Sequence, residues 1–207
     1  GRGGGGAADD PDAAPGFGRF GGVTSRVTNS PGSNRFVWDL RHSLGVTVPP
    51  GRYQVRLTAG TTVKTQPLTV LIDPRLAEEG TTVADLREQF EHNRRMRALV
   101  NDANRTAARV QAAQNRLRGA SGAAADTLAK VQAIAGKLLS EPVRYGKPGL
   151  QAHISYLSSM TGNTDQKIGR DAIARYQTLA RELAALTAEL DRVLGPEPGV
   201  GTGRAPD

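Results

Sequence analysis

The sequence contains no cysteine, and aromatic residues make up only 4% of its 207 residues. Without cysteine there can be no disulfide bond, no thiolate metal site and no cysteine nucleophile. No apolar run reaches the roughly 18 residues of a membrane-spanning helix, so we expect no membrane span. The chain starts with Gly1 and shows no signal peptide. We therefore expect a fragment of a longer protein, with its targeting information outside this sequence.

Side chains that carry chemistry are also scarce. The three histidines, His42, His92 and His153, fall in three different predicted elements and lack the spacing of metal ligands, so we interpret them as surface or interfacial residues. Residues 16–21 match the G-x-G-x-x-G pattern, but no strand precedes them and no helix follows. Neither a serine elbow nor a P-loop is present. The sequence therefore predicts no catalytic, metal-binding or cofactor-binding residues.

Positive charge is in excess: 27 Lys and Arg against 20 Asp and Glu give a net charge of +7. Such a balance is typical of proteins that bind nucleic acids or anionic surfaces. Here, however, the arginines are spread among acidic residues in the predicted helices and are not clustered with aromatics. We therefore favour solvated helix faces, and keep a basic nucleic-acid-binding module as a secondary alternative.

The first structured part of the chain has the residue pattern of β-strands. Residues 34–41 and 52–59 alternate between apolar and polar side chains, which is the period of a strand with one buried face. Phe36, Trp38 and Tyr53 fall on the apolar side. We expect these three residues to anchor the core of a small β domain.

Two further strands are predicted, a weak one at 23–28 and another at 62–72, so the β domain would hold four or five strands. Pro67 cannot donate to a ladder, which predicts an edge position or a bulge. The β domain would span residues 23–74, after a Gly-rich flexible linker at 1–22. A β unit of this size is only marginally stable, so we expect it to lean on a neighbour.

The remainder of the chain has a helical period. Thr82 and Asp85 have the spacing of a capping box at the start of a long helix. The apolar stripes, glycines and prolines predict helices at about 82–118, 123–140, 148–161 and 169–194. We expect an α+β fold in which a small antiparallel β unit precedes an antiparallel helical bundle at 75–195, with a disordered tail at 196–207. The long helices also offer a face for a possible homo-oligomer.

Two polar loops flank the third predicted helix and form the candidate site. One contains Arg144, Tyr145 and Lys147, and the other contains Asp165 and Lys167. We expect both loops to meet at one end of the bundle, where Asp165 would pair with Arg144 or Lys147 as a structural clamp. The alternative left open is a site for an anionic ligand or for a partner protein.

Several segments together resemble the C-terminal part of bacterial sortilin-like, BNR-repeat β-propeller proteins, which are often described as glycosyl-hydrolase-like. The resemblance covers about 25–194. The segments that carry it are Asn-Arg-Phe-Val-Trp-Asp-Leu-Arg at 34–41, Pro-Gly-x-Tyr-x-Val-x-Leu at 50–57, Gln-Pro-Leu-x-Val at 66–70, Asp-Pro-Arg at 73–75, Arg-Tyr-Gly-Lys-Pro-Gly-Leu at 144–150 and Asp-Gln-Lys at 165–167. The β unit is also similar to the Ig-like domain of flagellar hook-capping proteins.

This resemblance implies a secreted bacterial parent, extracellular or periplasmic, with a β-propeller upstream of the present chain. It implies for this chain a non-catalytic accessory module that packs on the propeller or on a partner protein. The alternative is a part of a glycoside hydrolase whose catalytic site lies mainly in the propeller. Because one fold hosts many functions, the family description alone gives little support for chemistry.

Overall fold

The computed structural model describes residues 31–196. The predicted linker at 1–22, the predicted strand at 23–28 and the predicted tail beyond residue 196 lie outside the described residues. The chain divides into two units, Gly1–Trp38 and Asp39–Asp207. Of the first unit, residues 31–38 are described, and they form neither helix nor strand.

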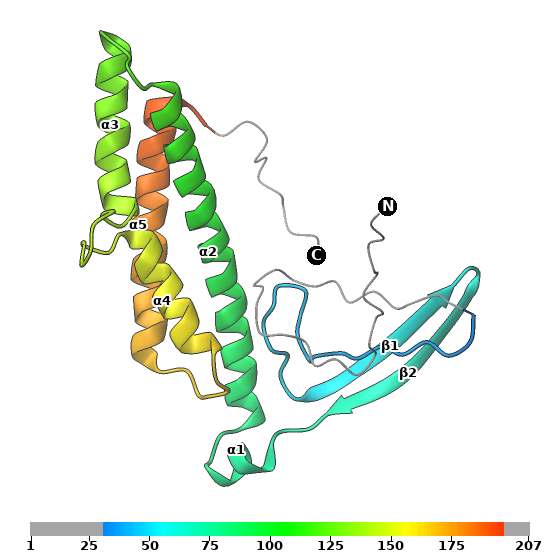
Figure 1. Ribbon diagram of the computed structural model, residues 1–207. Helices are drawn as coiled ribbons and strands as arrows, with labels where there is room; N and C mark the ends of the chain where they lie inside the picture. The colour runs from blue at the N-terminus through cyan, green and yellow to red at the C-terminus, as the bar shows by residue number, and fades with distance from the viewer. Residues whose placement is uncertain (1–30, 197–207) are drawn as a thin grey trace, which may run out of the picture. The chain divides into compact units, whose positions relative to one another are not determined.

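The second unit holds a β-hairpin followed by helices (Figure 1). The elements are β1 (Gly51–Ala59), β2 (Thr62–Val70), α1 (Pro74–Glu78), α2 (Val83–Arg116), α3 (Ala123–Leu138), α4 (Leu150–Gly162) and α5 (Arg170–Leu194). This confirms the α+β class, with a small antiparallel β unit followed by a helical bundle. The four long helices begin and end within about two residues of their predicted bounds, whereas the short α1 was not predicted.

The strand predicted at 34–41 is not formed. Leu40 has a φ of 57°, a left-handed conformation that interrupts an extended strand. Arg41 makes only a single isolated bridge, with Thr47. Within residues 31–196 the sheet has two strands, so the prediction of four or five strands is wrong for this part of the chain, where the β unit is a hairpin.

The turn of the hairpin follows from one glycine. Gly60 has a φ of 59°, and the loop between the paired residues Ala59 and Thr62 contains only Gly60 and Thr61. A positive φ at the first loop position alone is the pattern of a type II′ turn, whose twist matches that of the two strands. The register then runs without a bulge to Gly51 opposite Val70. Pro67 lies on an edge strand, as predicted.

α2 is a rod of 34 residues, about 50 Å long. Its first turn is closed by the predicted capping box, in which the Thr82 hydroxyl accepts from the Asp85 backbone and the Asp85 carboxylate accepts from the Thr82 backbone. The Thr82 hydroxyl also donates to the Asp85 carboxylate; this bond and that from the Thr82 backbone, helped by Lys167, lower the pKa of Asp85. The helix starts at Val83 because this cap binds a backbone N–H group of the first turn that has no partner within the helix.

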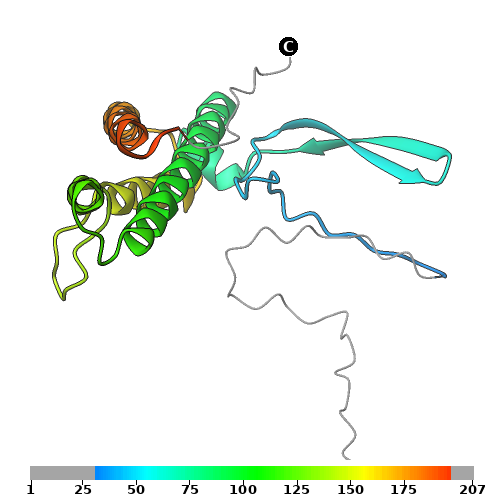
Figure 2. The same ribbon diagram turned by 90° about the horizontal axis from the view of Figure 1, so that it is seen from above.

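The helices form three rods rather than four. α3 and α4 follow one another along α2, and both also pack against α5. Figure 2 shows α5 and α3 side by side next to α2. Since α3 and α4 run in the same direction, antiparallel to α2 and α5, they behave as one helix interrupted by residues 139–149. The expected antiparallel bundle is thus an up-down-up arrangement with a broken middle rod.

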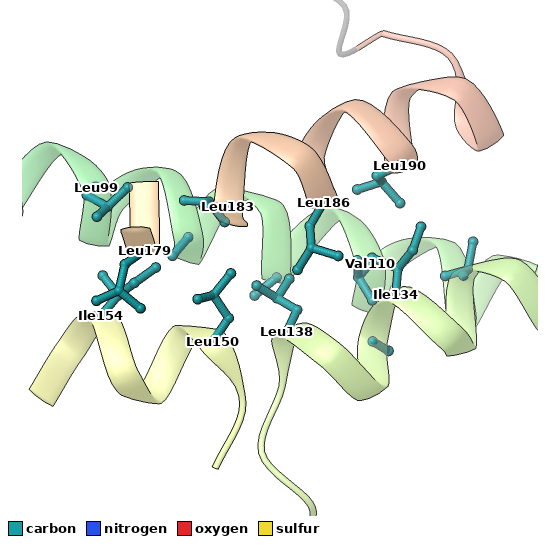
Figure 3. Packing of buried hydrophobic residues seen from close by; sticks show 14 of the residues in the cluster. Leu99, Val110, Ile134, Leu138, Leu150, Ile154, Leu179, Leu183, Leu186 and Leu190 are labelled. Carbon is teal, nitrogen blue, oxygen red and sulfur yellow. The ribbon is translucent and has the colours of Figure 1, made fainter. Parts of the chain in front are cut away.

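The core lies between these rods. Figure 3 shows Leu138 at the end of α3 and Leu150 at the start of α4 pointing into the same interior, opposite side chains of α5. The buried cluster consists of Met96, Leu99, Ala103, Ala107, Val110, Ala113, Val131, Ile134, Ala135, Leu138, Leu150, Ile154, Leu179, Leu183, Leu186 and Leu190. Alanines in α2 allow close approach of the neighbouring helices, and leucines of α5 fill the space that they leave.

Before β1, residues 41–48 form a tight loop in which the two valines turn inward. Val46 and Val48 are buried, and the Val48 backbone donates to the Leu40 carbonyl at 2.8 Å. The His42 ring packs edge-on against Phe90 of α2, with a centroid distance of 5.9 Å. This loop connects the chain before the hairpin to the side of α2.

Candidate functional site

The β1–β2 hairpin is amphipathic. Cross-strand partners share one face of a sheet, and the register pairs Tyr53 with Leu68 and Gly51 with Val70. We call this side the apolar hairpin face; it holds Tyr53, Val55, Leu57, Leu68 and Val70, with Gln66 opposite Val55 and Lys64 opposite Leu57. The side chains of Val55 and Leu57 are 53% and 56% exposed. The face is therefore largely open to solvent.

The opposite face of the hairpin is polar and basic. It presents Arg52, Arg56, Gln54 and three threonines, and Val63 and Pro67 are the apolar residues on it. Residues 51–70 contain three basic side chains, those of Arg52, Arg56 and Lys64, and neither aspartate nor glutamate. Carboxylates on another surface would favour its binding to this hairpin, and lysines or arginines on it would disfavour binding.

Tyr53 fixes the base of the hairpin. Its hydroxyl donates to the carbonyl oxygen of Pro49, and burial raises its pKa above 10.0 although the Arg87 charge opposes the rise. Of the three residues predicted to anchor a β core, only Tyr53 lies in a strand. Phe36 is 47% exposed and Trp38 is half-buried, and both lie outside any strand.

The structure does not bring the two predicted clamp loops together. Residues 139–149 precede α4, whereas Asp165 and Lys167 follow it, so the 13 residues of α4 separate the loops by about 20 Å. Among residues 31–196, no ion pair joins Asp165 to Arg144 or Lys147. Lys167 pairs instead with Asp85 of α2, at 3.4 Å. The clamp geometry was wrong because both loops had been assigned to one end of the bundle.

Within the first of these loops, the polar residues interact locally. The Arg144 guanidinium lies over the Tyr145 ring at 5.2 Å from its centroid, and Tyr145 is 91% exposed with a φ of 63°. The Lys147 backbone donates to the Glu141 carboxylate at 3.0 Å. Gly149 closes the loop: a Cβ there would lie 2.5 Å from the Leu138 carbonyl oxygen. The loop thus leaves the middle rod and returns to the same point.

A different residue holds the second loop. The Gln89 carboxamide nitrogen donates to the carbonyl oxygens of Thr161 and Thr164, at 2.9 and 2.6 Å, and its oxygen accepts from the Gln166 backbone at 3.1 Å. Asn93 adds a bond to Thr161 at 2.9 Å. We call this set the Gln89 latch; it ties the turn between α4 and α5 to α2.

Sequence reasoning missed Gln89, although a signal was present. Leu86, Gln89, Asn93 and Met96 follow one another at spacings of three, four and three residues, the repeat of a buried helix seam. Polar residues in such a seam need fixed hydrogen-bond partners when they are buried. The spacing therefore indicated two amides on the inward face of α2, of which Gln89 is buried and Asn93 is half-buried.

His92 is buried and does not lie on the surface, one of the two positions predicted for it. Its side chain is fully enclosed, and neither ring nitrogen has a hydrogen-bond partner. The ring packs edge-on against Tyr176 at 5.7 Å. Burial and the Arg95 charge lower the pKa of His92 below 6.5, while Glu88 opposes the shift. At neutral pH the imidazole is therefore uncharged.

A groove of about 490 Å³ lies between α2 and α5. Small and apolar residues of α5 line its floor, and its charged residues are already paired. Arg109 bonds Asp191 at 2.8 Å and the Gly195 carbonyl at 3.1 Å, and Arg105 bonds Asp102 at 2.5 Å. Since these ion pairs neutralise both guanidinium groups, the groove offers no unpaired cation for an anionic ligand.

Between residues 31 and 196, no group of three or more His, Asp or Glu residues has the geometry to hold a metal ion. Over the same range, no helix combines the length and the apolar character needed to cross a bilayer. Of the surfaces described, the hairpin is the one whose apolar side chains and backbone edges are both exposed.

Comparison with known proteins identified no similar protein. No protein-family model, no curated protein and no solved structure matches the chain. The resemblance of its sequence segments to sortilin-like proteins therefore stays a prediction.

Proposed function

We propose that this chain is a non-catalytic accessory module that binds another protein surface through the apolar hairpin face. The observation that carries the proposal is the exposure of Val55 and Leu57, 53% and 56%, in a sheet that has two strands within residues 31–196. An isolated two-stranded hairpin is marginally stable in water. Covering its apolar face would remove area from water at about 25 cal/mol per Å². A partner surface would thus stabilise the hairpin and gain affinity from it.

The resemblance of the sequence supplies the partner. Sortilin-like proteins carry a β-propeller upstream of the segments that this chain resembles, and we propose that the hairpin packs on that propeller. The protein would then be secreted, in an extracellular or periplasmic location. Any glycosidase-like chemistry would belong to the propeller, and the present chain would contribute contact area and orientation.

Binding to the separately produced propeller of the parent protein, measured by calorimetry, tests the proposal. The full chain is compared with Leu57→Glu, which places a carboxylate on the apolar hairpin face. Because burying one leucine side chain is worth about 1.5–3 kcal/mol, we expect binding to weaken about tenfold or more. Val143→Glu is the control, since Val143 is also an exposed apolar residue, 64% exposed, but lies between α3 and α4.

Two results would contradict the proposal. The first is an unmodified chain that is folded by circular dichroism but does not bind the propeller. The second is hydrolysis of glycosides by the chain without the propeller, which would make it an enzyme in its own right. Equal weakening by both substitutions would place the contact outside the hairpin.

A further inference from the structure

The two edges of the hairpin differ in their ability to accept another strand. Ala59 and Thr62 flank the two-residue turn, so they form a hydrogen-bonded pair, and such pairs alternate with non-bonded pairs along the register. Counting from the turn, the non-bonded residues direct their backbone groups outward. In β1 they are Arg52, Gln54, Arg56 and Thr58, and in β2 they are Val63, Thr65, Pro67 and Thr69.

Pro67 makes the difference between these two edges. It has no backbone N–H, so the outer edge of β2 lacks a donor in its middle, a common protection of edge strands. The outer edge of β1 has a complete series of donors and acceptors, and no backbone hydrogen bond from another described segment reaches it. β1 is therefore the strand beside which a further strand can pair.

The side chains of β1 determine which residue types would suit a strand paired beside it. Arg52 and Arg56 point to the basic face, and Val55 and Leu57 point to the apolar face. A strand paired with β1 places its residues alternately on these two faces. Acidic residues opposite the two arginines and apolar residues between them would match both faces at once.

We propose that the outer edge of β1 binds an extended partner strand in which apolar and acidic residues alternate. This inference rests on the proposed function, because it names the part of the hairpin through which the module holds its partner. A second copy of the chain is a poorer occupant. Pairing β1 with β1 would bring the arginines of both copies onto one face, where like charges repel.

The test is the binding of labelled peptides to the full chain, followed by fluorescence anisotropy. The probe has nine residues, the length of β1, and alternates valine with glutamate; a peptide that alternates valine with lysine is its control. We expect the glutamate peptide to bind and the lysine peptide not to bind. Arg52→Glu combined with Arg56→Glu should reverse this preference.

Gln54→Pro tests the edge itself. Gln54 lies opposite Pro67 in a non-bonded pair, so proline there removes an outward donor while the ladder between β1 and β2 stays intact. One lost backbone hydrogen bond changes affinity about fivefold, and the ring also obstructs the edge, so we expect a loss of about tenfold or more. Thr65→Pro, the matched change at the edge of β2, should leave binding unchanged.

The outcomes separate this inference from the proposed function. Glutamate-peptide binding that Gln54→Pro abolishes supports the inference, even if the propeller does not bind. Propeller binding that survives Gln54→Pro, with no peptide binding, overturns the inference and leaves the proposed function in place. A dimer of the chain that Gln54→Pro dissociates would also overturn it, because the occupant would then be a second copy.

Discussion

The side-chain nitrogen of Gln89 lies 2.6 Å from the carbonyl oxygen of Thr164, so a residue of α2 donates directly to the turn between α4 and α5. Two further bonds of the same carboxamide, to Thr161 and from Gln166, make the contact specific for an amide. A leucine could form none of these hydrogen bonds, and an ionised glutamate has no N–H to donate to the two carbonyl oxygens.

Replacing Gln89 with alanine should destabilise the bundle. The change removes three hydrogen bonds: those to the carbonyl oxygens of Thr161 and Thr164 and the one from the backbone N–H of Gln166. We therefore expect the free energy of unfolding to fall by about 2–3 kcal/mol. Urea unfolding followed by circular dichroism measures it. Gln111→Ala, an exposed glutamine of the same helix, should change stability by about 0.5 kcal/mol or less. Equal effects of the two substitutions would argue against the latch.

The buried His92 should make the bundle sensitive to mild acid. Its pKa is lowered in the folded state, so the unfolded chain takes up a proton first as the pH falls below about 6.5. Stability is therefore full above pH 6.5 and decreases below it, by up to about 1.4 kcal/mol per pH unit until the folded-state pKa is reached.

Thermal unfolding between about pH 7.5 and pH 5 measures this loss, because carboxylates begin to titrate only at lower pH. His92→Leu should flatten the profile in that range. The groups that face His92 are Tyr176, Arg95 and Glu88. The exposed His153 provides the control: if His153→Gln flattens the profile as well, burial of His92 is not the cause.

The ion pair of Arg109 should matter more than that of Arg105. The Arg109 side chain is 16% exposed and bonds both Asp191 and the end of α5, whereas the Arg105 side chain is 58% exposed and bonds a neighbour on its own helix. We expect Arg109→Ala to cost about 2 kcal/mol and Arg105→Ala about 0.5 kcal/mol or less. Urea unfolding measures both, and a larger loss for Arg105→Ala would contradict the comparison.

Two glycines of the middle rod should respond in opposite directions to alanine. At Gly149, a Cβ would lie 2.4 Å from the backbone carbon of Leu139, so Gly149→Ala forces α3 and α4 apart. At Gly136 nothing lies within 4 Å, and alanine is favoured inside a helix by about 0.5–1 kcal/mol. Melting temperatures should fall for the first variant and rise for the second. A stable Gly149→Ala protein would show that the close approach is not required.

The helices were predictable from the sequence because their signals are local. The Thr82–Asp85 capping box and Gly119 to Gly122 lie within a few residues of the ends that they define. In the same way, the two-residue gap between the strands predicted at 52–59 and 62–72 coincides with the hairpin turn that contains Gly60. Such signals need no knowledge of distant contacts.

What depended on distant contacts was not predictable. The alternation at 34–41 is that of a strand, but a strand also needs a partner, and the left-handed Leu40 ends the extended conformation. His92 was predicted to be a surface or interfacial residue because it lacks the spacing of a metal ligand, while its burial depends on packing against Tyr176 of α5. The clamp failed for a different reason: the order of the segments along the chain already places the two loops at opposite ends of the helix between them.

The excursion at 139–149 has a consequence for how this chain can change over evolutionary time. Both of its ends return to one point between Leu138 and Leu150, which share the same interior. Residues can thus be inserted or deleted at its exposed tip, near Tyr145, without shifting the phase of either half-helix. The interruption gives the bundle a site where length and composition vary independently of its packing, and where a foreign epitope can be grafted.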